Sequence, residues 1–159
     1  LRNKAATSDP SELVSGAWQP VLADPSITDP SAVRELILCS GKVRWELVKE
    51  RTKRWLEGKV AIGTMERLYP LPLDELAHVL ADYRHVTDVR WVQEEPINQG
   101  AYPYMNNHLA TELSAKLPGG LLDRMAVVAR PESSAPSVGQ QSIHLKEQRT
   151  LMDQAFTTE

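Results

Sequence analysis

Four apolar, strand-like segments alternate with four helix-like segments along residues 33–159, and this alternation limits the fold more than any other feature. The expected strands are short runs rich in Val, Ile, Leu and Ala, at residues 36–39, 60–66, 89–92 and 125–129. Apolar residues spaced three and four apart predict helices over residues 43–58, 73–80, 102–117 and 145–156. Strand followed by helix, repeated, is typical of an α/β fold: a mostly parallel sheet with helices on both faces.

Residues 1–32 differ in composition from the rest of the chain. Four prolines stand there among Ser, Asp and Thr: Pro10, Pro20, Pro25 and Pro30. Proline fixes its own φ and disfavours helix in the residue before it, so we expect a Pro-rich extended arm or linker with at most short turns. The apolar residues of this arm are expected to lie against the body of the protein; they are Val14, Trp18, Val21 and Leu22. Residues 33–159 then form the α/β domain.

The bulk properties limit the class of protein. The net charge is only −3, and a glutamate interrupts the densest basic stretch, residues 49–54. This pattern favours a solvated helix face over a nucleic-acid site. No apolar run approaches the roughly 20 residues that a membrane-spanning helix needs, so we expect no membrane partner. We also find no signal peptide.

The single cysteine, Cys39, lies in the apolar run of residues 36–39. One cysteine excludes a disulfide within the chain, and burial in apolar surroundings predicts an unreactive thiol. Both observations favour a reducing compartment, and we expect the cytoplasm of a bacterium. The chain begins with Leu1 rather than methionine, so we expect it to be a processed or truncated piece of a longer polypeptide.

Polar residues follow the first expected strand. Ser40, Gly41 and Lys42 come directly after it and open the next helix, where backbone N–H groups can hold an anion. The full spacing of a phosphate-binding loop is absent. The alternative, which we favour, is that Ser40 caps the helix and Gly41 makes a tight turn.

The third expected strand ends in a longer polar segment. Gln93, Glu94 and Glu95 precede a proline, and Asn98, Gln99 and Gly100 follow it. Adjacent acids on an extended segment point to opposite faces, so Glu94 and Glu95 cannot form a close acid–base pair. We expect an interface ion pair or a helix cap here. A solvated loop and a catalytic carboxylate are the less favoured alternatives.

A self-contained active site is not indicated. No two of the four histidines stand three or four residues apart, so we predict no metal site; they are His78, His85, His108 and His144. No catalytic serine, catalytic cysteine or dinucleotide motif is present. The four tryptophans are expected to pack the arm and the helix faces; they are Trp18, Trp45, Trp55 and Trp91. We therefore predict no catalytic residue and no cofactor-binding residue in this chain.

Three sets of residues, in order along the chain, carry a family resemblance. They are Leu38-Cys39-Ser40-Gly41-Lys42 with Glu46-Leu47; Trp91-Val92-Gln93-Glu94-Glu95-Pro96 with Asn98-Gln99-Gly100-Ala101; and Ser134-Ala135-Pro136 with Gly139, His144, Glu147-Gln148 and Ala155-Phe156. Together they resemble the C-terminal domain of the E1 component of 2-oxoglutarate dehydrogenase, a thiamine-diphosphate enzyme. The resemblance covers essentially the whole chain, and the second set is the most specific.

The resemblance implies a transketolase-type C-terminal domain with a five-stranded, mostly parallel sheet. Four strands are expected above, so the fifth is expected within residues 131–144. The resemblance also implies a parent enzyme of the citric acid cycle, which decarboxylates 2-oxoglutarate and passes the succinyl group to a lipoyl-bearing E2 subunit. Thiamine diphosphate and Mg²⁺ would bind to domains outside this chain. The chain would complete a homodimer and support those domains, with the loop from Gln93 to Tyr102 at or near the interface, and alone it would be inactive.

Two other classes remain open. One is a free-standing regulatory module that binds a small anion at Ser40-Gly41-Lys42. The other is the same domain of another thiamine enzyme, such as pyruvate dehydrogenase E1, a transketolase or the oxoadipate enzyme. Some relatives bind acetyl-CoA as an activator, at positions that read here as Arg67, Asp74 and Glu75. Two acids would repel the phosphates of the nucleotide, so we do not expect this regulation here.

Overall fold

A five-stranded sheet forms the centre of the protein. The computed structural model describes residues 4–123 and 125–157. The strands are β1 (Val21–Leu22), β2 (Glu35–Cys39), β3 (Val60–Met65), β4 (Asp88–Pro96) and β5 (Ala126–Arg130). Their order across the sheet is β1-β3-β2-β4-β5, and only β1 runs antiparallel to its neighbour. The predicted α/β class with a mostly parallel sheet is therefore confirmed.

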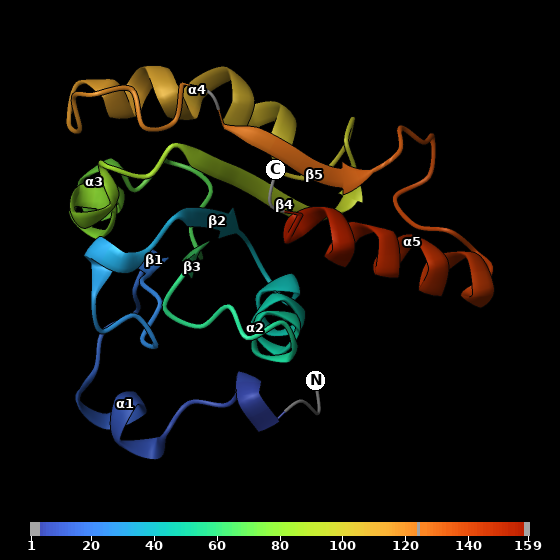
Figure 1. Ribbon diagram of the computed structural model, residues 1–159, viewed down its shortest axis with the longest axis horizontal. Helices are drawn as coiled ribbons and strands as arrows, with labels where there is room; N and C mark the ends of the chain where they lie inside the picture. Colours follow the sequence, from blue (N-terminus) through green and yellow to red (C-terminus); the bar gives the residue numbers. More distant parts are fainter. Residues whose placement is uncertain (1–3, 124, 158–159) are drawn as a thin grey trace.

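Helices cover both faces of the sheet, as Figure 1 shows. The α-helices are α1 (Pro10–Ser15), α2 (Val43–Lys53), α3 (Leu73–Leu80), α4 (Tyr102–Ser114) and α5 (Gln141–Ala155), and three short 3₁₀ turns are η1 (Lys4–Ala6), η2 (Pro30–Ala32) and η3 (Ala81–Tyr83). The helices α3 and α4 pack on one face, and α2 and α5 pack on the other. The sheet is thus buried between two separate apolar layers.

The central strand β2 has four successive apolar residues, 36–39, after Glu35. Leu36 and Leu38 point into the layer under α3 and α4, whereas Ile37 and Cys39 point into the layer under α2 and α5. All five residues of β2 are buried. A parallel strand that is covered on both faces needs apolar side chains at successive positions rather than at alternate ones.

The position of the fifth strand was wrongly predicted. Residues 131–140 contain no strand, and α5 begins at Gln141. The fifth strand is β1, which lies inside the segment expected to be an arm and pairs antiparallel with Thr64 and Met65 of β3. Two residues are too few to produce a periodic pattern. The pairing depends instead on contacts distant in sequence, such as the Pro20 carbonyl, which accepts from the Glu66 and Arg67 N–H groups.

The arm contains the same short turn three times. In each Asp-Pro-Ser sequence the aspartate Oδ1 accepts from both the N–H and the hydroxyl of the serine two residues later, at residues 9–11, 24–26 and 29–31. Such a turn forms from local hydrogen bonds between the aspartate and the serine, and it changes the direction of the chain. It also places Asp9 as the N-cap of α1, where Glu12 completes a capping box.

The outer part of the arm stands away from the body, against expectation. Val21 is buried, but Val14 and Trp18 are exposed, at 88% and 65%. Arm residues 6–19 and the start of α2 line a hollow of about 1220 Å³ that is open to solvent. The backbone hydrogen bonds described between the arm and the end of β3 begin at Pro20, whose carbonyl accepts from the Glu66 and Arg67 N–H groups.

Asp24 fastens the inner arm to the body. Its carboxylate contacts the Arg51 guanidinium, and both side chains are only 3% exposed. Asp24 Oδ2 also accepts from the Ile62 N–H at 2.9 Å, and Arg51 donates to the Val60 carbonyl at 2.9 Å. These side chains hydrogen-bond backbone groups of β3 beyond the reach of β1.

The helix α2 ends earlier than its apolar pattern predicts. It stops at Lys53 rather than near Gly58, because Trp55 adopts a positive φ of 57° and the Leu56 N–H bonds back to the Arg51 carbonyl. Trp55 is consequently 86% exposed, so the prediction that it packs on a helix face is wrong. Trp91 is fully buried.

Arg90 of β4 holds the end of α5. Its guanidinium donates to the Ala155 carbonyl at 3.1 Å and to the Thr157 carbonyl at 2.7 Å, and it also contacts the Asp88 carboxylate. The last carbonyl groups of a helix lack partners within the helix, so a cation beside them satisfies these groups and complements the helix dipole. The last helix is therefore attached to a central strand.

Candidate functional site

The Gln93 side chain organises the loop that follows β4. It is 3% exposed. Its Oε1 accepts from the Trp91 indole N–H at 3.1 Å and from the Tyr102 backbone N–H at 2.8 Å. Its Nε2 donates to the carbonyl groups of Pro96 at 3.0 Å and Gln99 at 2.8 Å. One buried amide thus closes the loop of residues 93–102 onto the start of α4.

Gly100 makes this closure possible. Its φ is +65°, a left-handed conformation that side chains rarely adopt. A Cβ atom there would lie 3.0 Å from the Glu95 Cβ and 3.1 Å from the Gln93 amide atoms. The loop therefore requires glycine at this position for two independent reasons.

Asn98 and Gln99 tie this loop to the segment after β5. The Asn98 amide exchanges two hydrogen bonds with the Ser133 backbone, at 3.0 and 3.1 Å, and Gln99 Nε2 donates to the Ser133 carbonyl at 2.7 Å. The Ile97 N–H donates to the Arg130 carbonyl, beyond a shift in the β4–β5 register between Val92 and Pro96. These amides, expected at an interface, make contacts within the chain.

Glu94 and Glu95 point to different sides of β4, as predicted. Glu95 is exposed, whereas Glu94 is partly buried and contacts the Lys42 ammonium group. Lys42 also lies 3.6 Å from Glu46. Burial lowers the pKa of Lys42, but its hydrogen bond to Glu94 and the charges of Glu94 and Glu46 outweigh burial and raise that pKa.

At Ser40, Gly41 and Lys42, the less favoured position for an anion, the one cationic group is already paired, because Lys42 contacts Glu94 and lies near Glu46. The N-cap residue of α2 is Lys42, and no side chain caps this helix, so the expectation that Ser40 is the cap is wrong. Gly41 has a φ of +73°, as the predicted tight turn requires. The arrangement holds Lys42 between two carboxylates, which weakens its attraction for a further anion.

Arg130, at the end of β5, joins these residues to α5. It is buried, and its guanidinium donates to Glu147 Oε2 at 3.1 Å, to His144 Nδ1 at 3.0 Å and to Gln148 Oε1 at 2.9 Å. Gln148 Nε2 in turn donates to Glu46 at 2.8 Å. A guanidinium is only a donor, so His144 Nδ1 acts as the acceptor.

We call this chain of contacts the edge network: Glu94, Lys42, Glu46, Gln148, Arg130, Glu147 and His144. It links the carboxyl ends of β4 and β5 to α2 and α5. Sequence reasoning missed Arg130 as its centre. The available signal was a basic residue directly after an apolar strand, because the carboxyl ends of parallel strands meet at one edge of the sheet.

The remaining predicted groups are distributed over the molecule. Cys39 is fully buried, as predicted, and burial raises the pKa of its thiol to about 11, although Thr64 and Arg44 lower it in part. At the positions associated with acetyl-CoA, Arg67 lies 3.6 Å from Glu75, and Asp74 pairs with Lys116 at 2.7 Å. In the part of the chain that the structure describes, no helix is long and apolar enough to cross a membrane.

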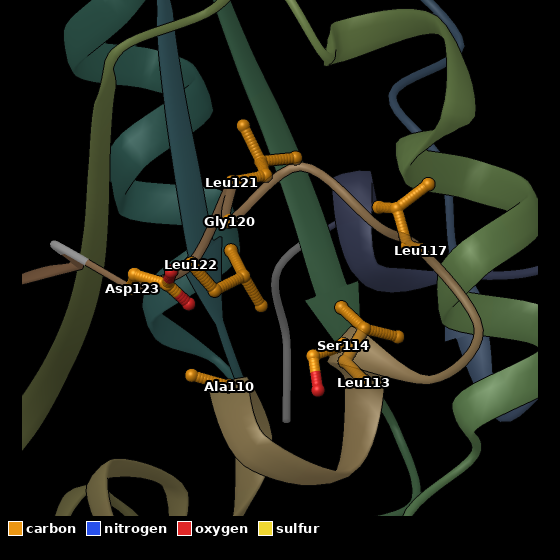
Figure 2. A pocket seen from close by; sticks show the side chains of 8 residues that line it. All are labelled: Ala110, Leu113, Ser114, Leu117, Gly120, Leu121, Leu122 and Asp123. Carbon is orange, nitrogen blue, oxygen red and sulfur yellow. The ribbon is translucent and has the colours of Figure 1, made fainter.

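The described residues offer no cluster of ligands for the Mg²⁺ that accompanies thiamine diphosphate. Within residues 4–123 and 125–157, no group of three His, Cys, Asp or Glu side chains could hold a metal ion. Figure 2 shows a small cavity at the end of α4, lined by Ala110, Leu113, Ser114, Leu117, Gly120, Leu121, Leu122 and Asp123. Its volume of about 10 Å³ leaves room for about one water molecule.

The fold and the edge network define a class: a doubly covered α/β domain whose polar strand ends are bonded to side chains of the flanking helices and to their own loops. The family model described as 2-oxoglutarate dehydrogenase C-terminal matches residues 7–156. The chain belongs to this family. The resemblance found in the sequence is thereby confirmed.

Similar proteins agree with this assignment. The chain is 40% identical to a 2-oxoglutarate dehydrogenase E1 component of Azotobacter vinelandii and 36% identical to one of Haemophilus influenzae, over 99% of this chain and 16% of each relative. It is 36% identical to a 2-oxoglutarate dehydrogenase E1/E2 component of Corynebacterium glutamicum, over 98% of this chain and 12% of that relative. The chain thus spans less than one fifth of the length of these relatives.

Proposed function

We propose that this chain is the C-terminal structural domain of an E1 enzyme that oxidatively decarboxylates 2-oxoglutarate in the citric acid cycle. Thiamine diphosphate and Mg²⁺ bind to other domains of that polypeptide, and the succinyl group passes to the lipoyl group of an E2 subunit. The observation that carries the proposal is the family match over residues 7–156, together with relatives named as 2-oxoglutarate dehydrogenase E1 components. The buried Cys39 suits a reducing compartment, and we place the enzyme in the bacterial cytoplasm.

The role of the domain in that enzyme is to support its neighbours and complete a homodimer. The loop of residues 93–102 has a rigid internal frame, because the amides of Gln93, Asn98 and Gln99 are engaged within the chain. Its outer surface presents Glu95 and the partly exposed Ile97. A preorganised loop binds a neighbouring domain with little loss of conformational entropy, which supports placing it at that interface.

Turnover measurements test the proposal. The purified 159-residue chain is supplied with 2-oxoglutarate, thiamine diphosphate, Mg²⁺ and an artificial electron acceptor, in parallel with the full-length E1 polypeptide. We expect turnover from the full-length protein only. Cofactor-dependent turnover by the 159-residue chain alone would contradict the assignment of the chemistry to other domains. Failure of the full-length protein to use 2-oxoglutarate would contradict the parent reaction.

A further inference from the structure

The two edges of the sheet differ in how their backbone groups are satisfied. At one edge, β1 covers the end of β3, and the Asp24 and Arg51 side chains bond the Ile62 N–H and the Val60 carbonyl. At the other edge, β5 is the last strand, as Figure 1 shows. Edge strands that are neither covered nor blocked by charge are templates for pairing with another strand.

Among the described residues no strand covers the outer side of β5, and Arg130, its one charged residue, directs its side chain to α5. Residues 126–129 read Ala-Val-Val-Ala, without a charge or a proline. Ala126 is exposed, and Val127 and Ala129 are only half-buried. Among the described residues, the backbone partners of β5 lie in β4 and in the residue after it, Ile97. The outer side of β5 therefore presents unpaired backbone groups among the residues that the structure describes.

The geometry identifies which groups these are. In a strand, the N–H and C=O of one residue point to the same side, and those of the next residue point to the opposite side. The Arg130 carbonyl points toward β4, because it accepts from the Ile97 N–H. Val128 and Ala126 then share that direction, whereas Val127 and Ala129 direct their N–H and C=O groups outward.

A row of backbone donors and acceptors selects an extended strand as its partner. The edge is five residues long, about 17 Å, so one added strand buries much less area than the roughly 1,600 Å² of a standard interface between separate molecules. A segment of the same polypeptide needs less contact area, because the tether gives it a high effective concentration. The relatives, of which this chain spans 12–16%, are long enough to supply one.

We propose that an extended apolar segment of the same E1 polypeptide, from outside this chain, pairs with the open edge of β5 and adds a sixth strand to the sheet. The inference rests on the proposed function and names the partner of the domain. It does not depend on which 2-oxo acid the enzyme uses.

Amide hydrogen exchange in the full-length E1 polypeptide tests the inference with an internal control. The Val128 amide, which faces β4, sets the level of protection for a paired group. We expect the Val127 and Ala129 amides to be protected to a similar level, on the order of 100-fold above an unpaired edge amide. Fast exchange at Val127 and Ala129 beside a protected Val128 would overturn the inference and leave the proposed function untouched.

A matched pair of proline variants separates pairing from simple burial. Val127→Pro removes an outward N–H, which an edge strand tolerates, whereas Val128→Pro removes a bond to β4. In full-length E1, Val127→Pro should abolish protection of Ala129 and keep that of Val128, and Val128→Pro should lower both. Unchanged protection of Ala129 in Val127→Pro would overturn the inference. Protection of Ala129 that disappears when the protein is diluted to monomers would assign the edge to a second copy and would also overturn it.

Discussion

The Asp24→Ala substitution should destabilise the domain by about 3–5 kcal/mol, the cost of breaking a buried ion pair by removing one partner. Asp24 and Arg51 are both 3% exposed, so the variant leaves a buried guanidinium without its counter-charge. It also removes the acceptor of the Ile62 N–H. Urea unfolding of the 159-residue chain at pH 7, followed by circular dichroism, measures the change. The melting temperature should fall by about 10 °C.

The arm supplies a matched control. Asp29 makes the same Asp-Pro-Ser turn as Asp24, with Ser31 in place of Ser26, but Asp29 is exposed. Asp29→Ala should therefore cost only about 1 kcal/mol, the value of a cap. Replacing Arg51 by methionine in the Asp24→Ala background should recover part of the loss, because no buried charge then remains. If Asp24→Ala costs no more than Asp29→Ala, the buried pair does not anchor the arm.

The pH dependence has a definite sign. Burial raises the pKa of Asp24, but the hydrogen bonds from Arg51, Ser26 and the Ile62 N–H outweigh it, and the folded-state pKa lies below the usual 3.8. Asp24 thus contributes stability that is present above pH 3.8 and is lost as the pH falls through the lowered folded-state pKa. The difference in unfolding free energy between the native chain and Asp24→Ala should shrink in that acid range. A difference that stays constant would contradict the linkage.

Three further substitutions or reactions test the site. Gly100→Ala should cost about 1–3 kcal/mol more in urea unfolding than Gly41→Ala, since both glycines have positive φ but only Gly100 has close neighbours; equal costs would contradict this reading. Gln93→Glu should lower the melting temperature and, in full-length E1, the activity, because a carboxylate replaces the amide donor to the Pro96 and Gln99 carbonyl groups; an unchanged loop would refute its central role. Cys39, with a pKa of about 11, should react with a thiol reagent at pH 8 only as fast as the chain unfolds, and rapid labelling of the native chain would contradict its burial.

The sequence predicts those parts of the fold that repeat along the chain. Strands β2 and β3 and the helices beside them follow from apolar spacing, because a buried parallel sheet imposes that spacing over many residues. Strand β1 has only two residues and exists through its pairing with Thr64 and Met65, which no local pattern records. Trp55 was misplaced for a related reason: its apolar character fits a helix face, but the helix has already ended in a left-handed turn.

The candidate site was predicted as a location rather than as a set of contacts. The polar strand ends do meet at one edge, as the fold class requires. That Glu94 faces Lys42 depends on the packing of α2, and that Arg130 reaches His144 depends on α5. In the sequence, Gln93 resembles any amide of a polar loop. Its four hydrogen bonds form only when the loop is closed. Partner choice among polar side chains is a tertiary property, since each side chain has several acceptors within its reach.

The attachment of α5 by Arg90 has a consequence for synthesis of the protein. Arg90 leaves the ribosome long before the carbonyl groups it needs, which follow 65 and 67 residues later. Until then the Arg90 guanidinium has the Asp88 carboxylate beside it but lacks its carbonyl acceptors at the place where the final helix will dock. A nascent chain that stops before Ala155 therefore lacks the hydrogen bonds that attach α5 to β4. Quality-control proteases should degrade it faster than the finished polypeptide.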